Sequence, residues 1–506
     1  MSYAPEPSPA AGPAFLHDLL DAAAHRWPRA NALADTAGRW TYAQLREAGL
    51  RAAAWLRDRG IRRGDRVLTQ LPNCRELAAL LYGTSRLGAV LVPVNPQMKP
   101  FHLTTVLRDA DPALVIGDAR TAGALREVTP APVVELDEAR QEIRAAAPVV
   151  GRAASVTGHD AALLIYTSGS TSAPKAVVCP HRQILFAVRA IDQVLRYRPD
   201  DVVFLRLPMS FDYGLHQLFL AALNGAAVHL AEEGHDLTLL RRIRATGATV
   251  VPLVPSLAQL LTHLAGRDPA ATRVRLFTNT GAALTEALCR DLRAGFPGAR
   301  IALMFGTTEC KRVSVLEPDG DLAKPGSVGP PIPGTAVEVT GEDGTPLPPG
   351  AHGEFVVRGP HVMSGYWGAP ELTAHRFRRD ERTGEVVLHT GDFGHMDEDG
   401  HLYFSGRRDD IVKHRGTRVS LLEIEAAALD VPGVRAAAAV SLHDPAALVL
   451  CAVADLPSTE PLVQGLVERL EAAKLPDRCV LLERLPLTPN QKTDRRGLAE
   501  IVRKQQ

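Results

Sequence analysis

Short apolar segments typical of β-strands alternate with longer segments of helical periodicity along most of this chain. In its first part, strand patterns occupy residues 66–71, 89–94 and 113–117, and helical patterns occupy residues 75–87 and 103–110. Strands and helices that alternate in this way form parallel or mixed sheets with helices on both faces. The alternation therefore predicts an α/β fold built of layered sheets.

The same alternation extends to both sides of this region. Residues 15–56 show a helical pattern interrupted by an extended piece at residues 38–42, and the Pro- and Ala-rich residues 1–13 are expected to form a flexible tail. Five further strands, each followed by a helical segment, are expected at residues 161–166, 202–205, 227–230, 249–253 and 275–278.

The pattern changes after Lys324, where Gly and Pro become dense and short alternating segments follow. This predicts a β-rich subdomain over about residues 325–408, within a large N-terminal domain of residues 14–408. The charged stretch at residues 406–410 marks the expected boundary. We expect residues 409–506 to form a small, mobile α+β C-terminal domain that acts as a lid.

Composition excludes several classes of partner. The chain has 506 residues, a length that suggests roughly three folding units. Its 57 basic and 57 acidic side chains give a formal net charge of +0, and no basic block occurs, which disfavours nucleic acids and anionic membranes. The sequence has no apolar run of the ~20 residues that cross a bilayer and no signal peptide, so a cytoplasmic location is expected. Its 6 cysteines include no Cys-x-x-Cys pair, which argues against a disulfide framework or a zinc site.

The most informative stretch follows the strand that ends at Tyr166. Small residues, mostly hydroxylated or Gly, run from residue 167 to residue 173, and Pro174 and Lys175 come next. Backbone N–H groups and hydroxyls of such a loop can surround polyphosphate oxygens while a lysine neutralises their charge. The candidate phosphate-binding residues are Thr167, Ser168, Gly169, Ser170, Thr171 and Lys175. The alternative is an ordinary Ser/Thr-rich surface loop, and a Walker A loop is excluded because Ala176 follows the lysine.

This stretch resembles the phosphate loop of the adenylate-forming superfamily, which comprises acyl-CoA ligases, amino-acid adenylation domains of peptide synthetases and luciferases. Five further motifs similar to those of the superfamily follow in the expected order, so that the whole set spans more than 300 residues. They are residues 305–309, 365–366, 390–392, 406–413 with Gly416, and 486–492. Their order makes chance a poor explanation.

The resemblance implies a reaction in which a carboxylate attacks ATP to give acyl-AMP and pyrophosphate, usually followed by transfer of the acyl group to a thiol. Lys492 would bridge the carboxylate and the α-phosphate, where two anions meet. Glu309 would hold Mg²⁺ together with Thr167, and Thr308 would contact phosphate. As alternatives, Glu309 is a solvated surface acid and Lys492 an ordinary surface lysine.

The resemblance also implies a nucleoside site and a hinge. The nucleotide-binding residues are Phe305, Gly306, Thr307, Asp392 and Arg407, of which Phe305 would face the adenine and Asp392 would accept both ribose hydroxyls. Asp409 matches the position at which the small domain pivots between adenylation and thioester formation, and it is therefore counted with the catalytic residues. As alternatives, Asp392 is a turn former and Asp409 an exposed linker acid.

An acid-binding pocket is expected around Asp212, which stands where amino-acid adenylation domains meet the substrate's amino group. A carboxylate in such a pocket is costly unless a cation or donor meets it, which favours a substrate that bears an amine. The alternative is a structural Asp212 bonded to backbone or to His216. The resemblance places these further residues around the pocket: Tyr213, His216, Asn279, Met304 and Arg312. Their polar lining disfavours a long alkyl chain and leaves open proline or another small amino acid, an aminobenzoate-like aromatic acid, and a dicarboxylate held by Arg312.

We therefore expect an enzyme that adenylates an amine-bearing carboxylic acid with ATP and Mg²⁺ and passes it to the phosphopantetheine of a separate carrier protein, as in antibiotic biosynthesis. The chain ends about 14 residues after Lys492 (506 − 492) with no carrier attachment site, so the thiol acceptor is expected on another molecule. The alternative is an acyl- or aryl-CoA ligase that uses free CoA. A third hypothesis, a nucleotide-binding protein without turnover, is disfavoured by Lys492, Glu309 and Asp392.

Overall fold

The computed structural model describes most of the chain. The described residues are 3–4, 13–98, 100–149, 152–153, 156–167, 174–232, 234, 236–268, 271–380, 383–407, 411–414, 417–443, 446–470, 472–488 and 493–505. Four groups of predictions fall wholly or largely outside these residues: the tail, the loop residues Ser168, Gly169, Ser170 and Thr171, the pivot Asp409 and the catalytic Lys492.

A six-stranded sheet forms the first layer, in the order β10-β9-β5-β4-β6-β7. Its neighbours are parallel except for the antiparallel pair β9 and β10, in which Thr167 lies opposite Lys175. The strands are β4 (Arg66–Gln70), β5 (Val90–Pro93), β6 (Leu114–Gly117), β7 (Val133–Glu135), β9 (Ala161–Thr167) and β10 (Lys175–Pro180). The accompanying helices are α3 (Arg75–Leu87), α4 (Pro100–Ala110), α5 (Ala122–Val128) and α6 (Leu136–Ala145).

An eight-stranded, mostly parallel sheet forms the second layer, in the order β16-β15-β14-β13-β11-β12-β2-β3. Its strands are β2 (Asn31–Asp35), β3 (Gly38–Thr41), β11 (Val202–Leu205), β12 (Ala227–Leu230), β13 (Val250–Leu253), β14 (Leu276–Asn279), β15 (Arg300–Phe305) and β16 (Ser314–Val315). Its helices are α1 (Leu16–Arg26), α2 (Tyr42–Asp58), α7 (His181–Leu195), α8 (Asp212–Asn224), α9 (Leu239–Ala245), α10 (Pro255–Arg267) and α11 (Glu286–Gly295). One large apolar core joins the two layers. The predicted layered α/β fold is confirmed.

A five-stranded antiparallel sheet follows, in the order β17-β18-β20-β19 with β21 paired to β20. Its elements are β17 (Ala336–Thr340), β18 (Gly353–Arg358), α12 (Pro370–Arg376), β19 (Phe377–Arg379), β20 (Val386–Met396) and β21 (Leu402–Arg407). These strands occupy the Gly- and Pro-rich region, where turns separate short alternating segments.

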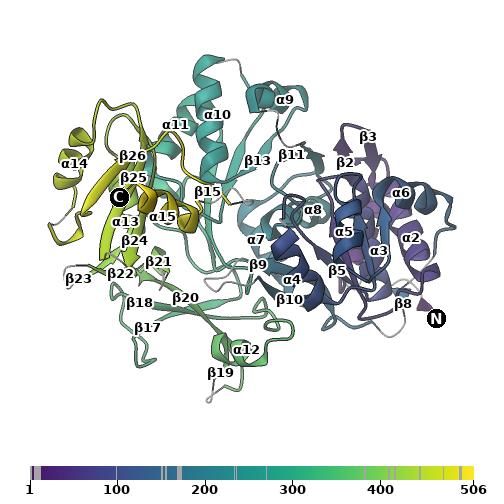
Figure 1. The fold of residues 1–506 in the computed structure, drawn as a ribbon. Coiled ribbons are helices and arrows are strands. Elements are labelled where there is room, and N and C mark those ends of the chain that lie inside the picture. The colour runs from purple at the N-terminus through teal and green to yellow at the C-terminus, as the bar shows by residue number, and fades with distance from the viewer. Residues whose placement is uncertain are drawn as a thin grey trace.

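The last hundred residues build a separate three-stranded sheet, β24-β25-β26, with helices on it. The elements are β22 (Ile411–His414), β23 (Thr417–Ser420), α13 (Leu421–Leu429), β24 (Val434–His443), β25 (Ala446–Ala454), α14 (Glu460–Val467), β26 (Arg478–Leu481) and α15 (Arg495–Lys504). Its apolar residues pack among themselves. This part lies beside α10 and α11, on the side away from the N-terminal elements (Figure 1), and Gln259 Nε2 donates to the Arg435 main-chain oxygen at 2.7 Å.

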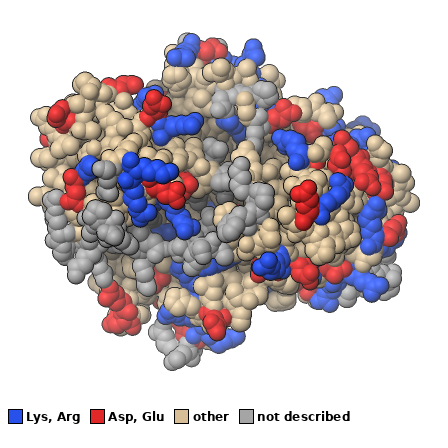
Figure 2. Space-filling view, viewed as in Figure 1, with Lys and Arg blue, Asp and Glu red and all other residues tan. Residues whose placement is uncertain are grey.

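Short elements and the surface complete the fold. The β1 (Tyr3–Ala4) and β8 (Arg152–Ala153) strands pair, and short 3-10 helices occupy Asp236–Thr238, Gly320–Leu322 and Ala472–Lys474. Acidic and basic side chains are interspersed over the face shown in Figure 2. Within the described ranges, no helix has both the length and the apolar composition that crossing a membrane requires.

Candidate active site

A cavity of about 420 Å³ lies where loops of both large sheets meet the five-stranded sheet. Hydroxyl, acidic and cationic side chains dominate its lining, which suits a polar, charged ligand. The lining residues used below are Thr167, Lys175, Ser210, Asp212, Tyr213, Thr280, Gly306, Thr307, Thr308, Glu309, Lys311, Arg312, Tyr366, Arg376, Gly391, Arg407, Thr488 and Thr493.

The chain segments that flank both undescribed motifs border this cavity. Thr167 and Lys175 are the two ends of the phosphate-loop motif, and Thr488 and Thr493 flank the motif that contains Lys492. The described flanks of two motifs that are some 300 residues apart in sequence therefore border one cavity.

A partly buried ion pair holds the chain after Lys492. Arg495 donates to both carboxylate oxygens of Glu425 on α13, at 2.5 and 3.2 Å, and also to the main-chain oxygen of Ala439 on β24. Leu487, before Lys492, forms a β-bridge with Thr493, after it. Arg495 thus attaches the downstream flank to α13 and β24, and the bridge joins the two flanks to each other.

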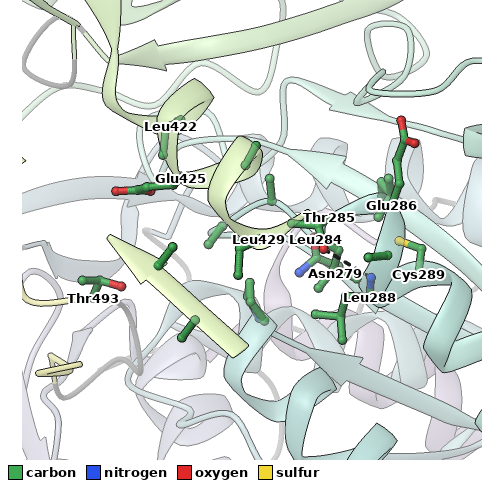
Figure 3. Close-up of a pocket in the computed structure, with 18 of the residues that line it drawn as sticks. Asn279, Leu284, Thr285, Glu286, Leu288, Cys289, Leu422, Glu425, Leu429 and Thr493 are labelled. Atoms are coloured by element: carbon green, nitrogen blue, oxygen red, sulfur yellow. Dashed lines mark hydrogen bonds between the residues drawn. The ribbon is translucent and has the colours of Figure 1, made fainter. Parts of the chain in front are cut away.

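A larger cleft of about 2620 Å³ separates α10 and α11 from α13 and β24. Figure 3 shows Leu429 of α13 facing Leu284 and Leu288 across it. Two residues that the sequence placed around the acid pocket, Asn279 and Met304, line this cleft, whereas Tyr213 and Arg312 line the smaller cavity.

The predicted nucleoside residues lie where the two cavities meet, because Gly306 and Arg407 border both. Phe305 stacks on Phe404 with a ring-centroid distance of 4.9 Å. Asp392 is 1% exposed and accepts from Arg407 Nε at 3.0 Å through Oδ1.

The other Asp392 oxygen, Oδ2, is buried and has no hydrogen-bond partner in the described part of the chain. Burial raises the pKa of this carboxyl group to about 6, although Arg407 opposes the shift. A buried acceptor without a donor is uncommon in folded proteins. Ribose hydroxyls would satisfy it.

Glu309 follows β15 in a tight turn and contacts Tyr366. The Tyr366 hydroxyl donates to Glu309 Oε1 at 2.6 Å, and burial together with this carboxylate raises the pKa of the tyrosine well above its usual value. Glu309 and Thr167 both line the cavity and offer hard oxygen ligands. Among the described residues, no cluster of three or more acidic, His or Cys side chains suited to a metal occurs. The arrangement fits Mg²⁺, which usually binds through one or two carboxylates plus substrate phosphates.

The Asp212 carboxylate already has a cationic partner. Lys311 Nζ lies 2.7 Å from Asp212 Oδ1 and also donates to Cys179 Sγ on β10 at 3.1 Å. Burial opposes the charges of both groups, but each charge stabilises the other, so the pKa of Asp212 stays lowered and the pKa of Lys311 raised. No described residue donates a hydrogen bond to Asp212 Oδ2, which is not among the buried, unpartnered atoms and borders the cavity, so this oxygen remains available.

His216 lies behind Asp212 rather than in the cavity. Its Nδ1 is 3.0 Å from the Asp212 main-chain oxygen and 3.6 Å from Oδ1. Burial lowers the pKa of His216 to about 4, so the ring is neutral near pH 7. The contact between Asp212 and His216 that we considered as a structural alternative exists, but the charge of Asp212 is matched by Lys311.

Polar groups without partners collect beside this ion pair. Arg312 Nη1 donates to the Lys311 main-chain oxygen at 2.6 Å, and the guanidinium lies over the Tyr213 ring at 5.0 Å. The Tyr213 hydroxyl is 2.6 Å from Thr278 Oγ1 and is thus already bonded. Besides Asp212 Oδ1, which is paired with Lys311 by charge, three buried atoms of cavity-lining residues have no hydrogen-bond partner among the described residues: Ser210 Oγ, Thr280 Oγ1 and Arg312 Nε.

Sequence reasoning missed Lys311 and Cys179. The signal for Lys311 was its rarity, since the chain contains only eight lysines, and its place two residues after Glu309. The turn from Gly306 to Arg312 buries it: a Cβ at Gly306 would lie 2.6 Å from the Lys311 main-chain oxygen, and Lys311 itself has a φ of 67°. Such a left-handed conformation of a non-glycine residue persists where the surrounding contacts determine it.

Comparison with known proteins agrees with this geometry. Residues 20–367 match the AMP-binding enzyme family, and residues 423–492 match the C-terminal domain of AMP-binding enzymes. The chain belongs to the AMP-binding enzyme family. The family predicted from the ordered motifs is thereby confirmed, and adenylate-forming enzymes bind ATP.

Curated relatives of this AMP-binding enzyme are named as synthetases and ligases. It is 32% identical to the AMB antimetabolite synthetase AmbB of Pseudomonas aeruginosa over 97% of its own length but 39% of that protein. It is 33% identical to an L-proline–[L-prolyl-carrier protein] ligase of Streptomyces coelicolor, over 90% of this chain and 91% of that one. A long-chain-fatty-acid–CoA ligase, FadD13 of Mycobacterium tuberculosis, is 30% identical over 90% and 91%. Several curated relatives, AmbB among them, are thus more than twice as long as the part that this chain spans.

Among solved structures, VinN superposes with a TM-score of 0.73 and 47% identity, over 78% of this chain and 98% of that one. VinN has also been solved in complexes with L-aspartate, at 47% identity, and with 3-methylaspartate, at 42% identity.

Proposed function

We propose that this AMP-binding enzyme adenylates an amino dicarboxylic acid of the aspartate class with ATP and then transfers the acyl group to the thiol of a separate carrier protein. The observation that carries the substrate class is the buried cluster of Asp212, Lys311 and Arg312 at one end of the cavity. The complexes of VinN with L-aspartate and 3-methylaspartate support the same class.

The charges of this cluster match such a substrate. With His216 neutral, the one acidic and two basic groups leave an excess of one positive charge. A buried excess charge is unfavourable unless a counter-ion meets it, so a second carboxylate beside Lys311 and Arg312 is favoured. The available Oδ2 of Asp212 would accept from the substrate's ammonium group.

Neutral polar groups would complete recognition. Ser210 Oγ, Thr280 Oγ1 and Arg312 Nε are buried and have no hydrogen-bond partner in the described part of the chain. Leaving such groups unmatched costs about 1–3 kcal/mol each, and a substrate that pairs with them recovers this free energy. A long alkyl chain would leave all three unmatched, which argues against a fatty acid.

The remaining residues serve the reaction at the other end of the cavity. A carboxylate oxygen of the acid bonds to the α-phosphorus of ATP while the bond to the β-phosphate oxygen breaks, which yields acyl-AMP and pyrophosphate. Lys492 would neutralise the two anions that meet, and Thr308, Thr167 and Lys175 would hold the phosphates. Asp392 would bind the ribose.

Magnesium and the mobile lid belong to the same proposal. Glu309 and Thr167 would hold Mg²⁺, which supplies positive charge to the phosphate oxygens when it is bound. In the second step the thiol sulfur bonds to the acyl carbon, AMP leaves with the electrons of the broken bond, and the thiol proton is released. We infer that residues 409–506 rotate about Asp409 between the two steps.

ATP–pyrophosphate exchange with a matched set of acids tests the substrate class. L-Aspartate and 3-methylaspartate should exceed succinate, which lacks the amine, and β-alanine, which lacks one carboxylate. Loss of either the amine or one carboxylate from the acid should lower kcat/KM by about 10-fold or more, because one charge-assisted contact with the protein is lost. Equal rates with succinate would contradict amine recognition, and faster exchange with proline, aryl acids or fatty acids would contradict the proposed class.

Free CoA is the alternative to a carrier protein as the thiol acceptor. Similarity to a carrier-protein ligase favours a phosphopantetheine arm, whereas similarity to a CoA ligase favours free CoA. Thioester formation should be compared with a phosphopantetheinylated carrier protein and with CoA at equal thiol concentration. Product formed equally well from CoA alone would favour the CoA ligase.

A further inference from the structure

Arg376 places a positive charge at the smaller cavity, and none of the roles proposed above uses this charge. It is the last residue of α12, is half-buried and lines the smaller cavity. Its Nη1 donates to the His389 main-chain oxygen at 3.2 Å. This is the one hydrogen bond of the guanidinium among the described residues, and no described carboxylate forms an ion pair with it.

A guanidinium that makes one hydrogen bond is far from satisfied. Arginine carries five N–H donors in a planar fork, so most of those of Arg376 have no acceptor in the described protein. The same fork fits two oxygens of a phosphate group at once. The side chain is thus equipped for an anion that the chain itself does not supply.

The guanidinium of Arg376 packs against the main chain of Gly391. Gly391 has a φ of 68°, and a Cβ there would lie 2.2 Å from Arg376 Nη1. The close approach places Arg376 directly against the residue that precedes Asp392, the candidate ribose ligand. A larger residue at position 391 would displace the guanidinium as well as strain the backbone.

The helix that carries Arg376 is also linked, through Thr373 and Tyr366, to Glu309. Thr373 of α12 accepts from the Tyr366 main-chain N–H at 2.9 Å, and a Cβ at Gly365 would lie 2.3 Å from Thr373 Cγ2. Tyr366 in turn donates to Glu309. Arg376 is therefore carried by a helix that contacts the neighbourhoods of both Glu309, the candidate metal ligand, and Asp392, the candidate ribose ligand. The phosphates of a bound nucleotide would lie between these two residues.

We propose that Arg376 binds a phosphate group of the nucleotide. The inference rests on the proposed binding of ATP in this cavity, but on neither the acid substrate nor the thiol acceptor. Because the α-phosphate and the two outer phosphates share the same chemistry, the ligands in the test are chosen to separate them.

Equilibrium binding of adenosine, AMP, ATP and pyrophosphate to Arg376→Gln tests the proposal without turnover. ATP affinity should fall by about 10- to 100-fold, the loss expected for a charge-assisted contact, while adenosine affinity stays unchanged. An equal loss for AMP assigns the contact to the α-phosphate; a loss confined to ATP and pyrophosphate assigns it to the outer phosphates. Unchanged ATP affinity, or an equal loss for adenosine, would overturn the proposal.

Two further variants separate phosphate binding from a structural role. Arg376→Lys keeps the charge and should retain part of the ATP affinity. Arg379→Gln is the matched control, because Arg379 is an exposed neighbour on β19 whose Nη1 donates to the Gly384 main-chain oxygen at 2.6 Å, outside the cavity lining. It should bind ATP like the unmodified protein. Equal losses of ATP affinity in Arg379→Gln and Arg376→Gln would refute a specific contact. This binding result does not depend on the acid substrate, so it would stand even if no acid supported pyrophosphate exchange.

Discussion

Neutralising either member of the Asp212–Lys311 pair should destabilise the protein strongly. The two charges are 2.7 Å apart, and the side chains of Lys311 and Asp212 are 0% and 5% exposed. At an effective dielectric constant of about 20, their attraction at this distance is about 6 kcal/mol before the desolvation of both groups is subtracted. Breaking a buried pair by removing one partner costs about 3–5 kcal/mol, because the other charge stays buried.

The double variant isolates the interaction. Lys311→Met and Asp212→Asn should each lower the free energy of unfolding by about 3–5 kcal/mol, while the combined variant should lose about 2–3 kcal/mol less than the sum of the two. Urea unfolding followed by tryptophan fluorescence measures all three. Losses that add in the combined variant would show that the two groups do not interact in the folded protein.

A solvent-accessible lysine, Lys324, serves as the control. Lys324 Nζ lies 2.9 Å from Asp397 Oδ2, but its side chain is 30% exposed. Solvent screens this lysine from Asp397 and from its second partner Asp399, so Lys324→Met should lower the free energy of unfolding far less than Lys311→Met does. A loss as large as that of Lys311→Met would mean that burial does not explain the difference.

Three further predictions concern ligands. Adenosine, which carries no phosphate to titrate, should bind tightly above pH 6 and progressively less tightly below it. The reason is that the pKa of Asp392 is about 6 and only the ionised carboxylate keeps both oxygens as acceptors. An equally steep dependence of adenosine affinity on pH in Asp392→Asn would contradict this. Arg312→Gln should lower kcat/KM for aspartate by about 10-fold or more and for β-alanine far less; equal losses would assign Arg312 a purely structural role. Lys492→Ala should lower pyrophosphate exchange severely while ATP affinity changes little, since the lysine acts on developing charge, and unchanged exchange would reject its role.

Much of the fold could be predicted because secondary structure follows local periodicity. The predicted helix at residues 75–87 and the strands at residues 202–205 and 227–230 have the same bounds in the structure. Other elements lacked a clear local signal. The strand β7 is three residues long, and β15 was not separated from the helical segment before it. Short strands acquire their identity from the neighbours with which they pair.

The candidate site was predictable only in part. Contiguous motifs indicated Glu309, Asp392 and Arg407, and the structure brings these residues to adjoining cavities. The residues expected around Asp212 do not all line one cavity, since Asn279 borders the larger cleft and His216 lies behind the carboxylate. Which side chains face a cavity depends on how loops from different sheets pack, and spacing along the chain does not encode that.

The amino-acid sequence by itself determined the layered α/β class, the family and the nucleotide chemistry, because these are written in local periodicity and in short contiguous motifs. Only the tertiary structure decided that Asp212 meets Lys311, that Lys311 also reaches Cys179 132 positions away, and that Arg376 rests on Gly391. The reason is physical: the state of a charge depends on burial and on the groups beside it, and both arise only when distant segments pack together.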